Sequence, residues 1–326
     1  MDLNKRKSAV AWLSVFSNTT LIILKIIVGL AIGSVSVISE AIHSGVDLLA
    51  AVIALFAVKQ SAKPADEKHP FGHGKFENLS GTIEALLIFV AAGWILYEAV
   101  KKLLYTGEIE APFWGVAVMG VSATANWVVS HFLFKVGKQT DSVALQADAW
   151  HLRTDVYTSL GVLGGLALLC VGEWLLPKDW NLHWIDPVAA ILVAMLIIKE
   201  AYTLTVRSAR DLIDMTLPPE EERWIRETLK TFRPAVHGFH RMRTRKAGSE
   251  RFIEFHIFVD AEMTVDKSHR LSHEIARKIE EHFGQSHVVV HVEPCRGDCT
   301  ANCAGGCLLD EEERQEIHAA RKAGGC

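Results

Sequence analysis

Six long apolar runs fill the first two thirds of the chain. They are expected at about Ala9–Gly33, Val35–Val58, Ile83–Leu104, Phe113–Val136, Val143–Val171 and Trp184–Val206. As a helix, each run is long enough to cross the roughly 30 Å hydrocarbon core of a bilayer. The pattern therefore predicts an all-α membrane domain of six transmembrane helices over residues 1–210.

The pattern changes after the sixth run. Pro218 and Pro219 followed by three glutamates are typical of a helix start. The elements expected there are a helix to about Phe232, strands at Gly238–Arg245 and Arg251–Asp260, a helix at Thr264–Phe283 and a strand at Ser286–Val292. The order αββαβ predicts a small α/β domain of ferredoxin-like or metallochaperone-like arrangement over residues 211–294. We expect residues 295–326 to form a separate tail.

Composition agrees with a membrane protein. Half of the residues are hydrophobic and the mean hydropathy is +0.20, which is high for a soluble protein. The net charge of −4 does not suggest a nucleic acid as partner. The first apolar run is too long for the core of a cleavable signal peptide. Nine Lys and Arg residues flank the runs on the side of the termini and three flank the other side, which predicts a multi-pass protein with both termini in the cytoplasm.

Ionisable residues recur at one spacing inside the second and fifth runs. His43 and Asp47 are four residues apart in the second run, and His151 and Asp155 are four apart in the fifth. Residues at this spacing share one helix face. Two imidazoles and two carboxylates make a ligand set suited to a tetrahedral divalent metal, and such groups in a bilayer usually mark a transport path. The alternative is two unrelated polar pairs, which the identical spacing disfavours. Asp148 lies one turn before His151 and is a candidate relay for metal or protons.

The segment after the second run offers a second set of ligands. Asp66, His69 and His73 supply an acid and two imidazoles near the expected cytoplasmic mouth. The alternative is a polar loop with solvated histidines. The neighbouring Gly-His-Gly-Lys75 is not a phosphate-binding loop, because the Walker spacing is absent and Phe76 stands where Ser or Thr is required. This argues against ATP as the energy source.

Together these features resemble the cation diffusion facilitator family of metal/proton antiporters. The resemblance covers residues 9 to 294 and rests on the six runs, the paired His-x-x-x-Asp motifs, the Ala147–His151 lead-in, the His69–Lys75 segment and the soluble α/β domain. It implies a homodimeric exporter whose transport site is His43, Asp47, His151 and Asp155. Related zinc and iron exporters carry an aspartate at the position of His43, so the histidine resembles the zinc-selective branch.

The resemblance also implies two further metal sites. The first consists of Asp66, His69 and His73. The second is a zinc cluster at the dimer interface, formed by His240, His256, His269, His291 and Glu293. Taken singly, each of these histidines is more simply interpreted as a structural or solvated side chain, and only the match to the family positions favours metal.

The tail carries four cysteines at a strict four-residue spacing: Cys295, Cys299, Cys303 and Cys307. Soft thiolates favour zinc, copper(I), cadmium or an iron–sulfur cluster. The alternatives are a flexible reduced tail or disulfides formed on oxidation. The family does not require this tail, so the resemblance says nothing about its role.

The leading hypothesis is secondary active efflux of Zn²⁺ from the cytoplasm in exchange for protons. Zn²⁺ is expected both as substrate and as a structural or regulatory ion, and the expected partners are divalent cations, protons, the lipid bilayer and a second copy of the chain. One alternative is efflux of Co²⁺, Cd²⁺, Ni²⁺ or Fe²⁺, because the same ligands accept these ions. Another is a membrane-anchored metal-binding or sensing protein. An enzyme is disfavoured, because the sequence shows no nucleophile–base pair and no nucleotide loop.

Overall fold

The computed structural model describes residues 3–32, 35–104, 113–175, 185–295, 297 and 305–323. The chain divides into two compact units, Met1–Leu212 and Ile213–Cys326. Each unit has hydrophobic core clusters made of its own residues.

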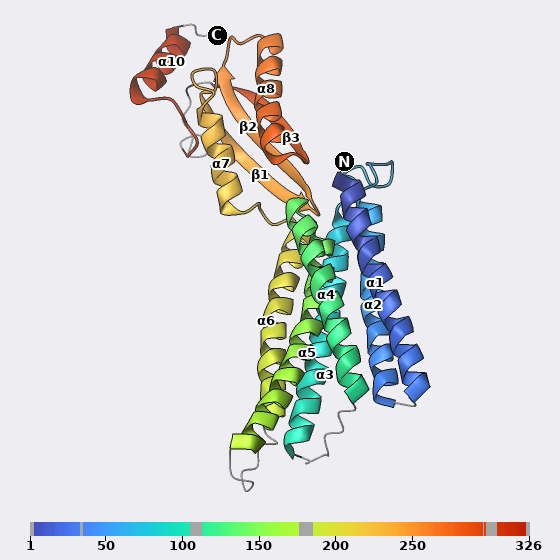
Figure 1. Cartoon of the computed structure of the whole chain (residues 1–326). Helices are drawn as coiled ribbons and strands as arrows, with labels where there is room; N and C mark the ends of the chain where they lie inside the picture. The colour runs from blue at the N-terminus through green and yellow to red at the C-terminus, as the bar shows by residue number, and fades with distance from the viewer. Residues whose placement is uncertain are drawn as a thin grey trace. The chain divides into compact units, whose positions relative to one another are not determined.

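The first unit is a bundle of six long helices (Figure 1). They are α1 (Leu3–Ile32), α2 (Val35–Ser61), α3 (Lys75–Leu104), α4 (Phe113–Gln139), α5 (Val143–Leu175) and α6 (Ile185–Leu212). Among the described residues, Leu3–Ala31, Ser44–Ser61 and Lys75–Lys101 are long and apolar enough to cross a membrane. Large apolar side chains face outward: Phe16, Leu30 and Val90 are 70–72% exposed, as suits contact with lipid. The all-α fold with six transmembrane helices predicted from the sequence is confirmed.

Helix α5 is central to the packing of this bundle. One core cluster joins residues of α1, α2, α4 and α5, and another joins residues of α3, α5 and α6. Gly81 lets α3 approach its neighbours closely, because a Cβ there would lie 2.7 Å from Ser208 Oγ and 2.8 Å from Val143 Cγ1. This packing places the second His/Asp pair, on α5, among the other helices.

Helix α3 begins two turns earlier than hydropathy predicts, at Lys75 instead of Ile83. The added turns carry polar side chains that are paired inside the bundle. Glu77 is fully buried and forms an ion pair with Lys7 of α1 at 3.0 Å. Asn78 donates a hydrogen bond to Asp211 of α6 at 2.9 Å. Hydropathy missed these turns because it does not register polar groups that neutralise one another across helices.

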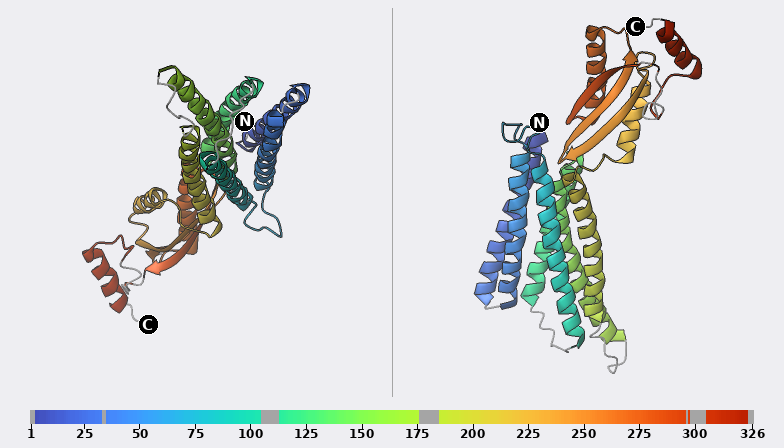
Figure 2. Two further views of the ribbon diagram at one scale, coloured as in Figure 1. Left: turned by 90° about the horizontal axis from the view of Figure 1, so that it is seen from below. Right: turned by 180° about the vertical axis from the view of Figure 1, so that it is seen from behind.

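The second unit is a three-stranded sheet with helices (Figures 1 and 2). Its elements are α7 (Pro219–Lys230), β1 (Gly238–Ala247), β2 (Glu250–Asp260), α8 (Val265–Phe283), β3 (Ser286–Cys295) and α10 (Glu311–Ala323). The strand order is β1-β2-β3, with β1 and β2 antiparallel and β2 and β3 parallel. The predicted αββαβ order is confirmed. Thr264 caps α8 by accepting a hydrogen bond from the Lys267 amide, as its place before the predicted helix suggests.

The core of this unit lies on one face of the sheet. Alternate residues of β2 are buried there, namely Ile253, Phe255, Ile257 and Val259. They pack in one cluster with Ile225 and Leu229 of α7 and with Ile275 and Ile279 of α8. Both helices therefore cover the same face. The opposite face of β2 carries Phe252, Glu254, His256 and Phe258, which are partly or largely exposed.

The prediction of a separate tail is wrong for the residues that the structure describes there. The Phe239 amide donates to the Gly306 carbonyl at 2.9 Å, and the Leu308 amide donates to the His237 carbonyl at 2.9 Å. Leu308 also packs against the core cluster, and Glu313 of α10 pairs with Arg233 at 2.7 Å. The outer edge of β1 has backbone groups that need partners, and the tail supplies them.

Candidate metal centres

The membrane site consists of Asp47, His151 and Asp155. One ligand atom from each lies within 4.8 Å of the others. Asp47 is on α2 and the other two are on α5, so the site forms where these helices meet. His151 Nε2 lies 3.2 Å from Asp47 Oδ1, and both side chains are only 6% exposed. An imidazole and two carboxylates inside a helical bundle can hold a divalent cation and compensate its charge.

His43 is the fourth ligand expected at the membrane site. It lies in α2, one turn before Asp47, but its side chain is outside the part of the chain that the structure describes. The backbone position agrees with the spacing argument, and the contribution of this imidazole stays a prediction.

Two asparagines support the membrane site from neighbouring helices. Asn126 of α4 donates a hydrogen bond to Asp155 Oδ2 at 3.4 Å. Asn18 of α1 donates to the backbone carbonyl of Asp47 at 3.5 Å. In the sequence, both stand out only as polar residues inside apolar runs. No short-range pattern links them to Asp47 or Asp155, because the partners are 29 residues away.

Asp148, predicted as a relay, is fully buried in the bundle. Neither of its carboxylate oxygens has a hydrogen-bond partner among the described residues. Glu84 of α3 is also fully buried, and its Oε1 accepts from Ser80 at 2.8 Å. Buried carboxyl groups with open hydrogen-bonding positions are costly, so they are consistent with a polar path next to the membrane site.

The loop site consists of Asp66, His69 and His73, whose ligand atoms also lie within 4.8 Å of one another. His69 Nδ1 lies 3.1 Å from Asp66 Oδ1, and His73 Nε2 lies 3.4 Å from Asp66 Oδ2. A hydrogen bond from the His69 backbone amide lowers the pKa of Asp66, and the Lys68 amide adds to this effect. The carboxylate is thus kept ionised and oriented toward both imidazoles, as a metal ligand must be.

The strand cluster consists of His240, His256 and Glu293, one residue from each of the three strands. The sheet register pairs His240 with His256 and His256 with His291, and Glu293 follows two residues after His291 on the same face. Glu293 Oε1 lies 2.7 Å from His256 Nδ1, and Glu293 Oε2 lies 3.1 Å from His240 Nε2. The residues present fit a bound zinc ion, because two imidazoles and a carboxylate converge from adjacent strands.

The electrostatics of the strand cluster favour an ionised glutamate. Partial burial opposes ionisation, but hydrogen bonds and charge interactions with His256 and His240 lower the pKa of Glu293. His291 lies at the margin of the cluster, with its Nε2 3.8 Å from Glu293 Oε1 and its ring 4.5 Å from that of His256.

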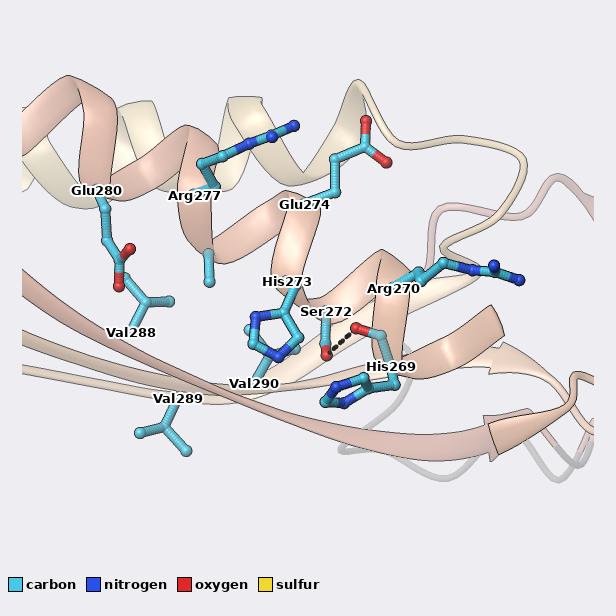
Figure 3. Close-up of a pocket in the computed structure, with 11 residues that line it drawn as sticks. His269, Arg270, Ser272, His273, Glu274, Arg277, Glu280, Val288, Val289 and Val290 are labelled. Atoms are coloured by element: carbon cyan, nitrogen blue, oxygen red, sulfur yellow. Dashed lines mark hydrogen bonds between the residues drawn. The ribbon is translucent and has the colours of Figure 1, made fainter. Parts of the chain in front are cut away.

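His269, the fifth residue predicted for the cytoplasmic cluster, is not among the three ligands that the structure brings together. It lies on α8, and its ring is 4.4 Å from that of His273, one turn further along the helix (Figure 3). His273 was not singled out by the sequence. The His-x-x-x-His spacing could have identified it.

The cysteine tail is only partly described. Cys295 ends β3, and Cys307 forms an isolated bridge with Gly238 at the start of β1. Cys307 forms no disulfide with another described residue. Cys299 and Cys303 lie outside the described residues, so the predicted thiolate site stays a prediction.

The chain matches two known protein families, one in each of its two units. Residues 11–213 match the family described as cation efflux transmembrane domain, and residues 217–295 match the cation efflux protein cytoplasmic domain. An uncharacterized transporter of Synechocystis sp. is 37% identical over 80% of this chain and 82% of the relative. The cation-efflux pump FieF of Cronobacter sakazakii is 29% identical over 90% of this chain and 95% of the relative. A solved structure described as a putative zinc transporter CzrB in its zinc form is 36% identical over 26% of this chain and 96% of that chain, with a TM-score of 0.25.

Proposed function

The chain belongs to the cation diffusion facilitator family of divalent metal efflux transporters, and on this premise we propose that it exports Zn²⁺ from the cytoplasm in exchange for protons. The observation that carries the proposal is the membrane site, where Asp47, His151 and Asp155 converge within 4.8 Å. The site lies inside the bundle that the family match identifies as the transmembrane domain.

The charge of the membrane site suits a divalent cation. Two ionised carboxylates carry two negative charges, which match Zn²⁺ in a medium where an unbalanced charge costs several kcal/mol. The imidazole of His151 adds a nitrogen ligand, and His43 would supply a second. Nitrogen ligands suit zinc better than they suit magnesium, calcium or manganese, which prefer an all-oxygen shell.

Proton exchange follows from the same ligands. An imidazole must be deprotonated to bind a metal, so a proton and Zn²⁺ compete for His151. Exporting a 2+ ion against an inside-negative potential costs about 4.6 kcal/mol per 100 mV, and one returning proton halves this cost. Because the chain carries no Walker motif, proton return is the natural source of energy.

Other features bear on the orientation of the protein in the membrane, on its assembly and on its additional metal sites. The excess of Lys and Arg in the loops on one side favours cytoplasmic termini and a multi-pass arrangement in the cell membrane. The match to the cytoplasmic domain of cation efflux proteins supports a homodimer. The loop site and the strand cluster are proposed to bind metal on the cytoplasmic side, where they would hold structural or regulatory zinc.

A flux assay on the purified full chain tests the proposal. The protein is reconstituted in liposomes, and Zn²⁺ movement is followed with an enclosed zinc indicator, with and without a pH gradient. We expect the pH gradient to accelerate Zn²⁺ flux. An enclosed pH indicator should report proton movement in the opposite direction at the same time. Zinc binding without any flux would instead support a membrane-anchored metal-sensing protein. Zn²⁺ flux that does not depend on the pH gradient would contradict proton exchange.

A second measurement concerns the choice of metal. His43→Asp keeps four ligands at the site but replaces a nitrogen with a hard oxygen and adds a negative charge. Transport should widen toward Fe²⁺ and Mn²⁺, and zinc binding should depend less steeply on pH because one competing imidazole is gone. Identical metal and pH profiles for the two proteins would mean that His43 is not a ligand.

A further inference from the structure

One buried carboxylate is bonded to three other parts of the helical bundle. Glu77, in the first turn of α3, is fully buried, and Lys7 of α1 forms an ion pair with it at 3.0 Å. Ser61 donates a hydrogen bond to Glu77 Oε1 at 2.9 Å, and Ser142 donates to Glu77 Oε2 at 2.5 Å. The Ser61 hydroxyl also lies 3.1 Å from the Val58 carbonyl, but the charged carboxylate is the stronger acceptor. Both oxygens of Glu77 therefore have partners, and no two partners belong to the same helix.

The two serines stand at the ends of the helices that carry the metal ligands. Ser61 is the last residue of α2, and Ser142 immediately precedes α5. These two helices supply all the described ligands of the membrane site. Ser142 also caps α5, because its Oγ accepts a hydrogen bond from the Leu145 amide at 3.4 Å. One hydroxyl group thus fixes the first turn of α5 and ties it to Glu77.

The third helix bonded to Glu77 also reaches the membrane site. Lys7 lies on α1, the helix whose Asn18 donates to the backbone carbonyl of Asp47 at 3.5 Å. The helices α1, α2 and α5 therefore meet twice, once at the membrane site and once at Glu77. The second meeting point is held by charge-assisted hydrogen bonds, which are stronger than neutral ones, and breaking it would leave an uncompensated charge inside the bundle.

A single contact leaves two helices free to pivot about it, whereas a second contact fixes their relative position. The separation of Asp47 from the ligands on α5 therefore depends on Glu77. We propose that Glu77 is a positioning residue of the membrane site: it holds the end of α2 against the start of α5 and so keeps the ligands at a separation that suits a divalent cation. The inference rests on the proposed role of this site in metal transport.

The test uses the full chain in detergent micelles with Co²⁺ as probe. The visible absorption of Co²⁺ is strong in a tetrahedral site and weak in an octahedral one, so it reports the arrangement of the ligands. The background protein carries His69→Ala and His256→Ala, which remove one ligand each from the loop site and the strand cluster. The part of the absorption that Asp155→Ala abolishes belongs to the membrane site. Zn²⁺ titrated against the bound Co²⁺ then gives the zinc affinity of this site.

The decisive variant is Ser61→Ala with Ser142→Gly. It removes both hydroxyl groups but leaves the ion pair of Lys7 and Glu77, and glycine is tolerated at the start of a helix. The zinc affinity of the membrane site should fall roughly tenfold, as is typical when groups that orient metal ligands are lost, and the absorption per bound Co²⁺ should weaken. Ser61→Thr with Ser142→Thr keeps both hydroxyl groups and should bind as the background does.

Thr140→Ala is the matched control. It removes another buried hydroxyl, but one that donates to the Val136 carbonyl of α4, the helix it follows, at 2.8 Å. It should therefore leave zinc affinity and Co²⁺ absorption unchanged.

A thermal melt separates positioning from simple support of the fold. If Ser61→Ala with Ser142→Gly lowers the melting temperature but keeps the zinc affinity and the Co²⁺ absorption of the background, the proposal is overturned. It is also overturned if the threonine variant binds as weakly as the variant without hydroxyl groups, or if Thr140→Ala loses as much affinity. A background whose Co²⁺ absorption does not depend on Asp155 would instead contradict the proposed metal site itself, and with it this role of Glu77.

Discussion

The membrane site and the strand cluster each bring three ligands together, but they compensate charge differently. The membrane site offers two carboxylates and one described imidazole, and Asp47 and His151 are almost completely buried. The strand cluster offers one carboxylate and two imidazoles, and all three residues are partly exposed. A 2+ ion is neutralised at the first site and keeps a net positive charge at the second. Solvent tolerates that charge, whereas a membrane does not.

The two sites are also assembled in different ways. At the membrane site, Asp47 and His151 are 104 residues apart and meet through the packing of α2 against α5. In the strand cluster, the hydrogen-bonded register of three adjacent strands fixes the ligands. The first arrangement can change when helices move, and the second is tied to an intact sheet. This difference fits the proposed roles of a transport site and of a structural or regulatory site.

The largest expected effect on transport comes from removing a charge at the membrane site. Asp47→Asn keeps the shape of the side chain but removes one of the two negative charges. An uncompensated charge in the membrane costs about 2.5 kcal/mol or more, so Zn²⁺ flux in liposomes should fall roughly a hundredfold. The control is Asp141→Asn, which removes a carboxylate that is 29% exposed and paired with Arg207. If Asp47→Asn transports Zn²⁺ as fast as the wild-type protein, Asp47 is not part of the transport site.

The largest expected effect on stability concerns the independence of the two units. Phe255 is fully buried in the core of the second unit, and Phe255→Ala should lower the free energy of unfolding of that unit by about 3–5 kcal/mol. Calorimetry of the full chain should show that one transition moves to lower temperature while that of the helical bundle stays. Val289→Ala changes an exposed position of β3 and should leave both transition temperatures unchanged. An equal shift of both transitions would contradict two separately folded units.

A smaller effect is expected from metal at the strand cluster. Zn²⁺ at a hundred times its dissociation constant would stabilise the second unit by about 2.7 kcal/mol. His256→Ala removes the ligand that contacts Glu293 at 2.7 Å, so most of this stabilisation should disappear in a thermal melt, while flux falls much less than in Asp47→Asn. His287→Ala is the matched control, because His287 is an exposed histidine of β3 on the same face of the sheet as His256. If both variants keep the zinc-induced shift, the strand cluster does not bind zinc.

The smallest effect is a pH dependence within the second unit. Burial lowers the pKa of His237, although Asp260 and Glu313 partly offset this. A histidine whose pKa is lower in the folded state is protonated more readily in the unfolded state. Its stabilising effect is present above about pH 6.5 and is lost as the pH falls from there through the lowered folded pKa. His237→Gln should therefore flatten the fall in melting temperature between neutral and mildly acidic pH, and an unchanged slope would count against a titrating His237.

The sequence alone determined the elements of this protein and the spacing of its ligands. Apolar runs longer than a bilayer is thick defined six helices, and alternation defined the strands of the αββαβ unit. Helix geometry placed His151 and Asp155 on one face of α5 without any knowledge of the fold. These are local properties, because each depends on residues only a few positions apart.

Only the tertiary structure decided which of these local patterns meet. It brought Asp47 to His151, added Asn126 to the membrane site and joined the tail to the edge of β1. It also extended α3 through polar turns, because Glu77 finds Lys7 on another helix. Such contacts depend on how whole elements pack, and neither hydropathy nor spacing within one segment contains that information.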